Sequence, residues 1–198
     1  IWESEDPKFS NPILKHLKER QGESTRENTL KSFGGAGENT AYTATTSYFN
    51  PKLCKIIYSS YCPKNGTIFD PFSSVVRPYM AKILDYNYVG CEVRKDECDK
   101  INEMLNTNSL FEESDVRVLN MDCREFETDQ KFDLVFTCPP YWNLETYSEQ
   151  DNDLSFITDY SDFLTEMSKV YSKCSSLMHD KSYCCFVVAD FRDYSEGR

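Results

Sequence analysis

A short apolar run that ends on two prolines is the feature that most restricts how this chain can fold. Leu134 to Thr137 are strand-forming residues, and Pro139 and Pro140 follow almost at once. Proline has no amide hydrogen and fixes its own backbone angle, so a strand cannot continue past this point. In open α/β sheets, ligands bind at the carboxyl ends of strands. The run therefore predicts a buried strand that delivers a rigid turn and two aromatic residues to a binding site, or else an ordinary strand exit whose aromatic residues cap the core.

The rest of the chain alternates helical and strand patterns. Asn50 before Pro51 is typical of a helix cap, and apolar residues at helical spacing continue to about Tyr61. Further helices are expected to about Asp85, around Cys98, Ile101 and Leu105, and on a stripe capped by Thr158 that contains Tyr160, Phe163, Leu164, Met167, Val170, Tyr171, Cys174 and Leu177. Strands are expected at 67–70, 88–92, 116–119, 134–137 and 183–189, the last wholly apolar like a buried parallel strand. This order predicts a doubly wound, mostly parallel sheet with helices on both faces.

Composition limits the class of protein. The chain has 198 residues, of which 39% are hydrophobic, and we expect one domain at 47–198 behind a polar arm or loop at 1–46. The net charge of -11 would repel a polyanion unless basic residues gather locally or a partner supplies them. No apolar run has spanning length and no signal peptide is seen, so we expect a soluble, cytoplasmic protein, and the start at Ile1 suggests a fragment or trimmed domain.

The nine cysteines show no C-x-x-C spacing, and the chain has only two histidines. A structural zinc site needs four such ligands, so we expect no metal and predict free, buried thiols of a reducing compartment.

Three of the expected strands end in or near an acid: Asp70, Glu92 and Asp122. In a doubly wound sheet these ends lie side by side. A carboxylate after the second strand is placed to hold a ribose diol, and one after the third can accept a hydrogen bond from an adenine amino group. Because no phosphate-binding glycine loop is present, this pattern favours S-adenosylmethionine over NAD or ATP. The alternative is that each acid caps the helix that follows it.

These motifs resemble a known family in their order and spacing. The segments are Phe49-Asn50-Pro51, Phe69-Asp70-Pro71-Phe72, Glu92, Asp122 and Thr137-Cys138-Pro139-Pro140-Tyr141. Together, over roughly residues 47 to 193, they look like the S-adenosylmethionine-dependent amino-methyltransferases of DNA, which methylate adenine N6 or cytosine N4. The nearest likeness is to methylases of phages and mobile elements, in which Pro-Pro-Tyr is followed by a segment like 143–148. The resemblance implies a Rossmann-like methyltransferase fold. It also implies that the protein acts in the cytoplasm of a bacterium or of a phage-infected host.

The resemblance also implies residue roles. Cofactor-binding residues would be Phe49 at the methionine end, Asp70, Pro71, Phe72 and Ser73 beneath the methionine part, Glu92 on the ribose, and Asp122 with the Cys123 backbone on the adenine. Catalytic residues would be Cys138, Pro139, Pro140 and Tyr141. The Cys138 side chain and the Pro139 carbonyl would accept both hydrogens of the target amine, and Tyr141 would stack on a base flipped out of the duplex.

Two positions differ from the family pattern. Cys138 stands where the family has Asp, Asn or Ser, and the serines at 73–74 and Val75 stand where glycines usually follow. A thiol is a weak hydrogen-bond acceptor. Two alternatives follow: an enzyme whose Cys138 attacks a pyrimidine carbon, in DNA or RNA, and a degenerate methyltransferase-fold subunit that only binds. The first alternative lacks a Lys, Arg or His near Cys138 in sequence to activate the thiol.

Target recognition has no evident segment in this chain. The stretch between Asp70 and Cys138 leaves no room for an inserted domain, and the last strands of the family's sheet have no counterpart before Arg198. We therefore expect target recognition from beyond Arg198 or from a partner chain, with DNA as substrate and RNA still open. Basic and aromatic residues mix in one further cluster, Arg77, Pro78, Tyr79 and Lys82. We interpret this cluster as a solvated helix face rather than as a nucleic-acid contact.

Overall fold

The computed structural model describes residues 49–107, 114–142, 147–148 and 150–188, and the statements below concern these residues. The chain separates into two units, Ile1–Tyr48 and Phe49–Arg198, of which only the second contains described residues. The arm or loop expected at 1–46 therefore lies outside them. No helix within the described ranges is long and apolar enough to cross a membrane.

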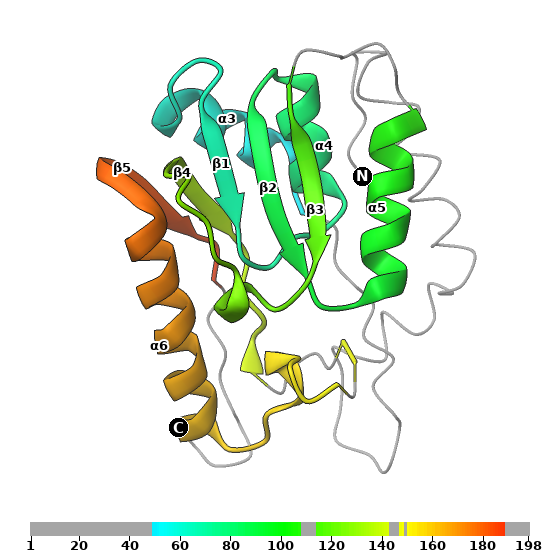
Figure 1. The fold of residues 1–198 in the computed structure, drawn as a ribbon, viewed down its shortest axis with the longest axis vertical. Coiled ribbons are helices and arrows are strands. Elements are labelled where there is room, and N and C mark those ends of the chain that lie inside the picture. Colours follow the sequence, from blue (N-terminus) through cyan, green and yellow to red (C-terminus); the bar gives the residue numbers. More distant parts are fainter. Residues whose placement is uncertain (1–48, 108–113, 143–146, 149, 189–198) are drawn as a thin grey trace, which may run out of the picture. The chain divides into compact units, whose positions relative to one another are not determined.

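Five parallel strands form one sheet in the order β3-β2-β1-β4-β5 (Figure 1). The strands are β1 (Thr67–Asp70), β2 (Asn87–Glu92), β3 (Val116–Asn120), β4 (Phe132–Thr137) and β5 (Met178–Phe186). The chain winds outward from β1 to β3 and then returns to β4 on the other side of β1. The carboxyl ends of β1 and β4 therefore form the switch point at which such sheets bind ligands. The predicted parallel, doubly wound sheet is confirmed.

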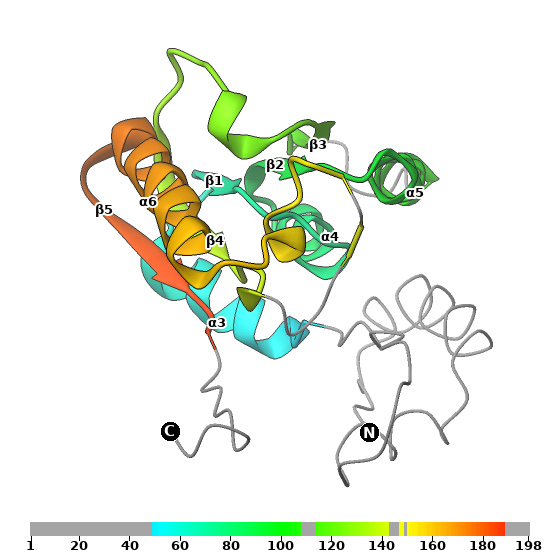
Figure 2. The same cartoon turned by 90° about the horizontal axis from the view of Figure 1, so that it is seen from below.

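The helices cover both faces of the sheet, as predicted. They are α3 (Pro51–Tyr61), α4 (Val76–Ile83), α5 (Lys95–Thr107) and α6 (Tyr160–Leu177), with short 3-10 turns η1 (Cys123–Glu125) and η3 (Leu154–Phe156). Figures 1 and 2 show α3, α4 and α5 along one face and α6 on the other. The Asn50 side chain caps α3 by accepting from the Lys52 amide at 2.9 Å, as predicted. Helix α6 is capped by Asp159 rather than by Thr158.

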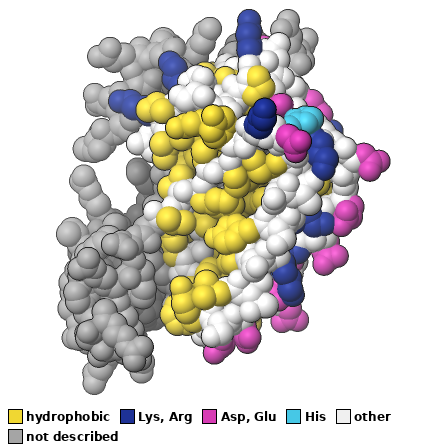
Figure 3. Space-filling model, turned by 90° about the vertical axis from the view of Figure 1, so that its left-hand side faces the viewer, with side chains coloured by type: hydrophobic (Ala, Val, Ile, Leu, Met, Phe, Trp, Pro, Cys, Tyr) yellow, Lys and Arg dark blue, Asp and Glu magenta, His cyan; other side chains and the backbone are white. Residues whose placement is uncertain are grey.

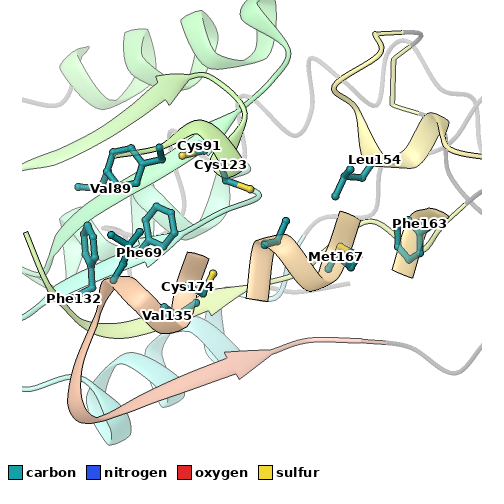
Figure 4. Packing of buried hydrophobic residues seen from close by; sticks show 13 residues of the cluster. Phe69, Val89, Cys91, Cys123, Phe132, Val135, Leu154, Phe163, Met167 and Cys174 are labelled. Carbon is teal, nitrogen blue, oxygen red and sulfur yellow. The ribbon is translucent and has the colours of Figure 1, made fainter. Parts of the chain in front are cut away.

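One hydrophobic core, called the main core below, lies between the sheet and α6 (Figure 4). Phe69, Val89 and Val135 from three neighbouring strands pack with residues of α6 such as Met167 and Val170. The alternate strand residues are buried as well, because the opposite face of the sheet is covered by α3 and α4. Most side chains of the three central strands are thus buried, which fixes the strand ends that carry the site.

The predicted stripe on α6 is buried only in part. Its buried side chains are Phe163, Met167, Val170, Cys174 and Leu177. Three other members are largely exposed, namely Tyr160 (53%), Leu164 (49%) and Tyr171 (44%). The sheet covers one narrow side of the helix, and the flanking apolar residues face outward.

The prediction of a buried fifth strand is wrong. β5 begins at Met178, directly after α6, and among the described residues it pairs only with β4. Tyr183 is 54% exposed. The ring of Tyr183 lies 4.9 Å from Tyr61 of α3, and that of Phe186 lies 4.8 Å from Tyr171 of α6. Viewed from this side, Figure 3 shows a band of hydrophobic side chains on the surface.

The basic and aromatic cluster at the start of α4 is not a solvated face either. Arg77 is only 2% exposed, and Pro78 and Tyr79 are also buried. Arg77 instead points into the protein, where it meets Asp70.

Candidate functional site

The three predicted acids lie along one edge of the sheet. Asp70 ends β1 and Glu92 ends β2, while Asp122 follows the end of β3 by two residues. Since β1, β2 and β3 are neighbours in the sheet, their carboxyl ends are brought together as predicted. The side chains nevertheless have different surroundings.

Glu92 keeps one carboxylate oxygen available. Its Oε1 accepts from the Arg94 amide at 2.9 Å and from Arg94 Nε at 3.4 Å. Within the described ranges no donor bonds to Oε2. Burial raises the pKa of Glu92 above its ordinary value of 4.5, and the positive charge of Arg94 opposes this shift. The chemistry of this group fits a ribose diol, which needs a hydrogen-bond acceptor.

Asp70 is fully buried and its carboxylate is saturated. Oδ1 accepts from the Phe72 amide at 3.1 Å and from Thr137 Oγ1 at 2.5 Å. Oδ2 accepts from Arg77 Nε at 2.6 Å and from Tyr88 Oη at 2.5 Å. With four donors on two oxygens, the side chain has no acceptor site left for a ligand. Asp70 can therefore shape a cofactor floor only through the turn that it holds.

The turn after β1 is pressed against β2. The Ser73 amide donates to the Cys91 carbonyl at 2.7 Å, and Ser73 Oγ lies 3.0 Å from Tyr88 Oη. A Cβ placed on Gly90 would come within 2.7 Å of Ser73 Cβ, so the glycine permits this close approach. The Ser73 side chain is thus held against the sheet. Sequence reasoning missed Gly90 because its signal is an isolated glycine inside a strand pattern.

Asp122 is held by a residue that sequence reasoning missed. Its carboxylate caps η1 by accepting from the Arg124 amide at 2.9 Å, and Arg124 Nε bonds both of its oxygens at 3.0 Å. Arg124 also bonds Glu166 of α6. An adenine amino group at Asp122 would have to share the carboxylate with Arg124. The neighbouring Cys123 thiol is buried, which raises its pKa to about 12.

The segment from Cys138 to Tyr141, called the Cys138 segment below, leaves the sheet directly beside the turn that follows Asp70. Thr137 is the last residue of β4 and donates to Asp70, so the next residue, Cys138, begins at the switch point. Cys138 is half-buried, and its Sγ lies 3.2 Å from Tyr141 Oη. Pro139 between them is buried, whereas Pro140 and Tyr141 are half-buried. Phe49 completes this corner, with its ring 5.4 Å from Phe136 of β4.

Aromatic residues border this segment. Trp142 has a left-handed backbone (φ 51°), which is uncommon for a bulky residue and places its indole on the main core, 5.2 Å from the ring of Tyr160. Its buried Nε1 finds no acceptor in the described part of the chain. Further along, Arg94 lies over the ring of Tyr147 at 5.8 Å, which places Tyr147 near Glu92, the carboxylate that Arg94 also bonds.

The thiols behave largely as predicted. All nine cysteines are free, and six of them are buried. Within the described ranges, no three His, Cys, Asp or Glu side chains gather as metal ligands would.

Comparison with known proteins gives a fold. No protein-family model matches the chain, and no curated protein matches its sequence. The solved structures that resemble it include the glycopeptide N-methyltransferase MtfA complexed with S-adenosyl-L-methionine, at a TM-score of 0.52 and 8% identity. They also include TrmN from Thermus thermophilus, at a TM-score of 0.50 and 13% identity. The match covers 76% of this chain and 59% of the first structure, and 72% of this chain and 39% of the second. The chain therefore spans less than two thirds of either. With its five-stranded parallel sheet and flanking helices, the chain has the Rossmann-like fold of the S-adenosylmethionine-dependent methyltransferases.

Proposed function

We propose that this chain transfers a methyl group from S-adenosylmethionine to the exocyclic amine of adenine (N6) or cytosine (N4) in a base flipped out of DNA. The observation that carries the proposal is the position of Cys138 to Tyr141. This segment leaves β4 at the switch point, next to the turn that follows β1. A target amine held there would lie beside a cofactor bound across the ends of β1 and β2.

Residues at the sheet edge support the cofactor assignment to different degrees. Glu92 fits the ribose hydroxyls through its available Oε2, and Phe49 fits as a wall at the methionine end. Asp122 and the Cys123 backbone would face the adenine, with Arg124 sharing the carboxylate. Asp70 does not fit as a direct ligand. When bound, the cofactor supplies an electrophilic sulfonium methyl group.

The chain's own contribution to catalysis is orientation. Cys138 Sγ and the Pro139 carbonyl would accept the two hydrogens of the target amine, which directs the nitrogen lone pair toward the methyl group. Transfer would join the target nitrogen to the methyl carbon as the carbon–sulfur bond broke with its electrons on sulfur, and the amine would release one proton to water. Tyr141 would stack on the extruded base. Such positioning accelerates transfer without a covalent intermediate.

The net charge of the chain bears on how it would bind DNA. With a net charge of -11, the chain needs DNA contacts from a further region or a partner chain, as expected from the sequence. We propose the cytoplasm as the location, where cofactor and DNA meet. RNA is the alternative substrate, and a methyl-transfer screen on both nucleic acids separates the two.

Cofactor titration tests the proposal. Calorimetry with S-adenosylmethionine should show binding to the parent chain. Replacing Glu92 by Gln should raise Kd by about tenfold to a hundredfold, the effect of losing a charged hydrogen-bond acceptor. The exposed Glu127, which pairs with Lys173 on the surface, supplies the matched control Glu127→Gln, for which Kd should not change. Failure of a folded parent to bind would overturn the proposed enzyme.

The same titration should depend on pH. Because the pKa of Glu92 is raised, its carboxylate takes up a proton at a higher pH than the ordinary 4.5. Affinity should therefore start to fall above pH 4.5 as the solution is acidified, and Glu92→Gln should lose this part of the pH dependence.

Cys138 separates the proposal from a covalent pyrimidine methyltransferase. Replacing Cys138 by Asn, a stronger acceptor of the type found in the resembling family, should raise kcat by up to about tenfold, the value of one hydrogen bond. A covalent mechanism predicts complete loss of transfer instead, because the nucleophile is gone. Radiolabelled transfer from the cofactor to DNA, measured for both proteins, distinguishes these results.

A further inference from the structure

Segments of the proposed site that are distant in sequence meet at one buried arginine. Arg77, in the first turn of α4, is 2% exposed. Its Nε donates to Asp70 Oδ2 at 2.6 Å, and its Nη2 donates to the Phe72 carbonyl. Its guanidinium also lies over the ring of Phe49, 4.9 Å from the centroid. One side chain therefore touches both the proposed methionine wall and the turn beneath it.

Asp70 extends this contact to the proposed catalytic segment. The carboxylate that Arg77 bonds also accepts from Thr137 Oγ1 at 2.5 Å, and Thr137 directly precedes Cys138. A continuous buried chain of hydrogen bonds thus runs from the Phe72 carbonyl through Arg77 and Asp70 to Thr137. Burying a carboxylate without a cation is strongly unfavourable, so the chain depends on a positive charge at position 77.

We propose that Arg77 is a positioning residue that sets the distance between the turn after β1 and the Cys138 segment. The proposal rests on the proposed function and identifies a residue that controls its geometry without touching substrate. The planar fork of arginine can bond Asp70 and the Phe72 carbonyl at the same time. Lysine keeps the charge but has a single head group that cannot reproduce the fork. The charge maintains the buried pair, and the fork maintains the spacing.

The test is Arg77→Lys in the full chain, measured as kcat and as cofactor Kd. Loss of spacing should lower kcat by between about tenfold and a hundredfold, since small displacements of reacting groups have effects of this size. Cofactor Kd should rise by a smaller factor than kcat falls, because Arg77 contacts Phe49 at the methionine end but the ribose contact at Glu92 is kept. An unchanged kcat per folded molecule would make Arg77 a purely structural residue and overturn the proposal.

Thr137→Val breaks the same chain at its other end without removing a charge. It should also lower kcat, and the double variant with Arg77→Lys should be no slower than Arg77→Lys alone, because both act through Asp70. Additive losses would contradict a shared path. Asn102→Ala is the control for destabilisation: Asn102 bonds the Val118 carbonyl and amide at the far edge of the sheet, at 2.8 and 3.2 Å, so its loss should leave kcat unchanged.

A readout without catalysis keeps this inference separate from the proposed function. Hydrogen exchange of the ligand-free chain should become faster in both 70–76 and 137–142 when Arg77 is replaced by Lys, and in neither when Asn102 is replaced by Ala. Faster exchange in only one segment, or in neither, would contradict the positioning role. If exchange responds as expected but the parent transfers no methyl group, the proposed function fails while the coupling of the two segments stands.

Discussion

Replacing Asp70 by Ala should lower the free energy of unfolding by about 3–5 kcal/mol, the usual effect of removing one partner of a buried ion pair. The variant leaves the Arg77 guanidinium buried without its anion and leaves the hydroxyls of Thr137 and Tyr88 without their acceptor. A domain of this size is stable by about 5–15 kcal/mol, so a substantial part of its stability would be lost. Urea unfolding followed by circular dichroism measures the change.

Asp99→Ala is the matched control for Asp70. The Asp99 side chain is 62% exposed and pairs with Lys95 on the surface of α5, where such a pair contributes about 0–1 kcal/mol. Equal effects of the two substitutions would contradict the central role of Asp70 in the fold. Because Asp70→Ala is expected to destabilise the fold, any loss of cofactor binding in this variant would reflect lost structure. Glu92→Gln is for this reason the cleaner probe of the pocket.

Phe136→Ala should destabilise the domain by about 3–5 kcal/mol, as expected for deleting a fully buried ring. Phe136 is 0% exposed, and its ring packs edge-on against Tyr58 of α3 at 5.6 Å and against Phe49 at 5.4 Å. Because Phe49 packs on this ring, the substitution should also weaken cofactor binding. The two effects are measured by urea unfolding and by calorimetry at a temperature where the variant remains folded.

Phe156→Ala is the control for the loss of an aromatic ring. Phe156 is 44% exposed on η3, so its removal should change stability by only about 0.5 kcal/mol. Phe136→Leu refills most of the volume and should recover much of the stability, but not the edge-on ring contacts. If Phe136→Ala were as stable as the parent, the packing described for this corner would be wrong.

Local patterns in the sequence predicted the first four strands, part of the fifth, the α3 cap and the placement of three acids along one edge. Strand periodicity, proline positions and cap residues are properties of neighbouring residues, so they can be recognised in one chain. The contacts of the acids could not be predicted, because they depend on side chains distant in sequence. Thr137 reaches Asp70 from the neighbouring strand, 67 residues away in sequence, and Arg77 turns inward only because a buried carboxylate lies beneath it.

The same limit explains the two errors in burial. The apolar run at 183–189 is predicted to be buried when the pattern alone is considered, but burial requires elements that cover both faces of the sheet at that strand. The stripe on α6 shows the right period, but the width of the face that the sheet covers is set by packing. Arg124 illustrates the difficulty in the site: a basic residue close to an acid gives little indication that it will occupy that acid on both oxygens.

The strand order also has a consequence for how the domain opens. Hydrogen bonds at the centre of a sheet are protected on both sides, whereas edge strands lose theirs to water in small, local fluctuations. In the order β3-β2-β1-β4-β5, the turn after β1 and the Cys138 segment both leave central strands. Among the described strands β5 stands at the edge, so we expect it to fray while these two segments stay in place, and we expect the site to open after it.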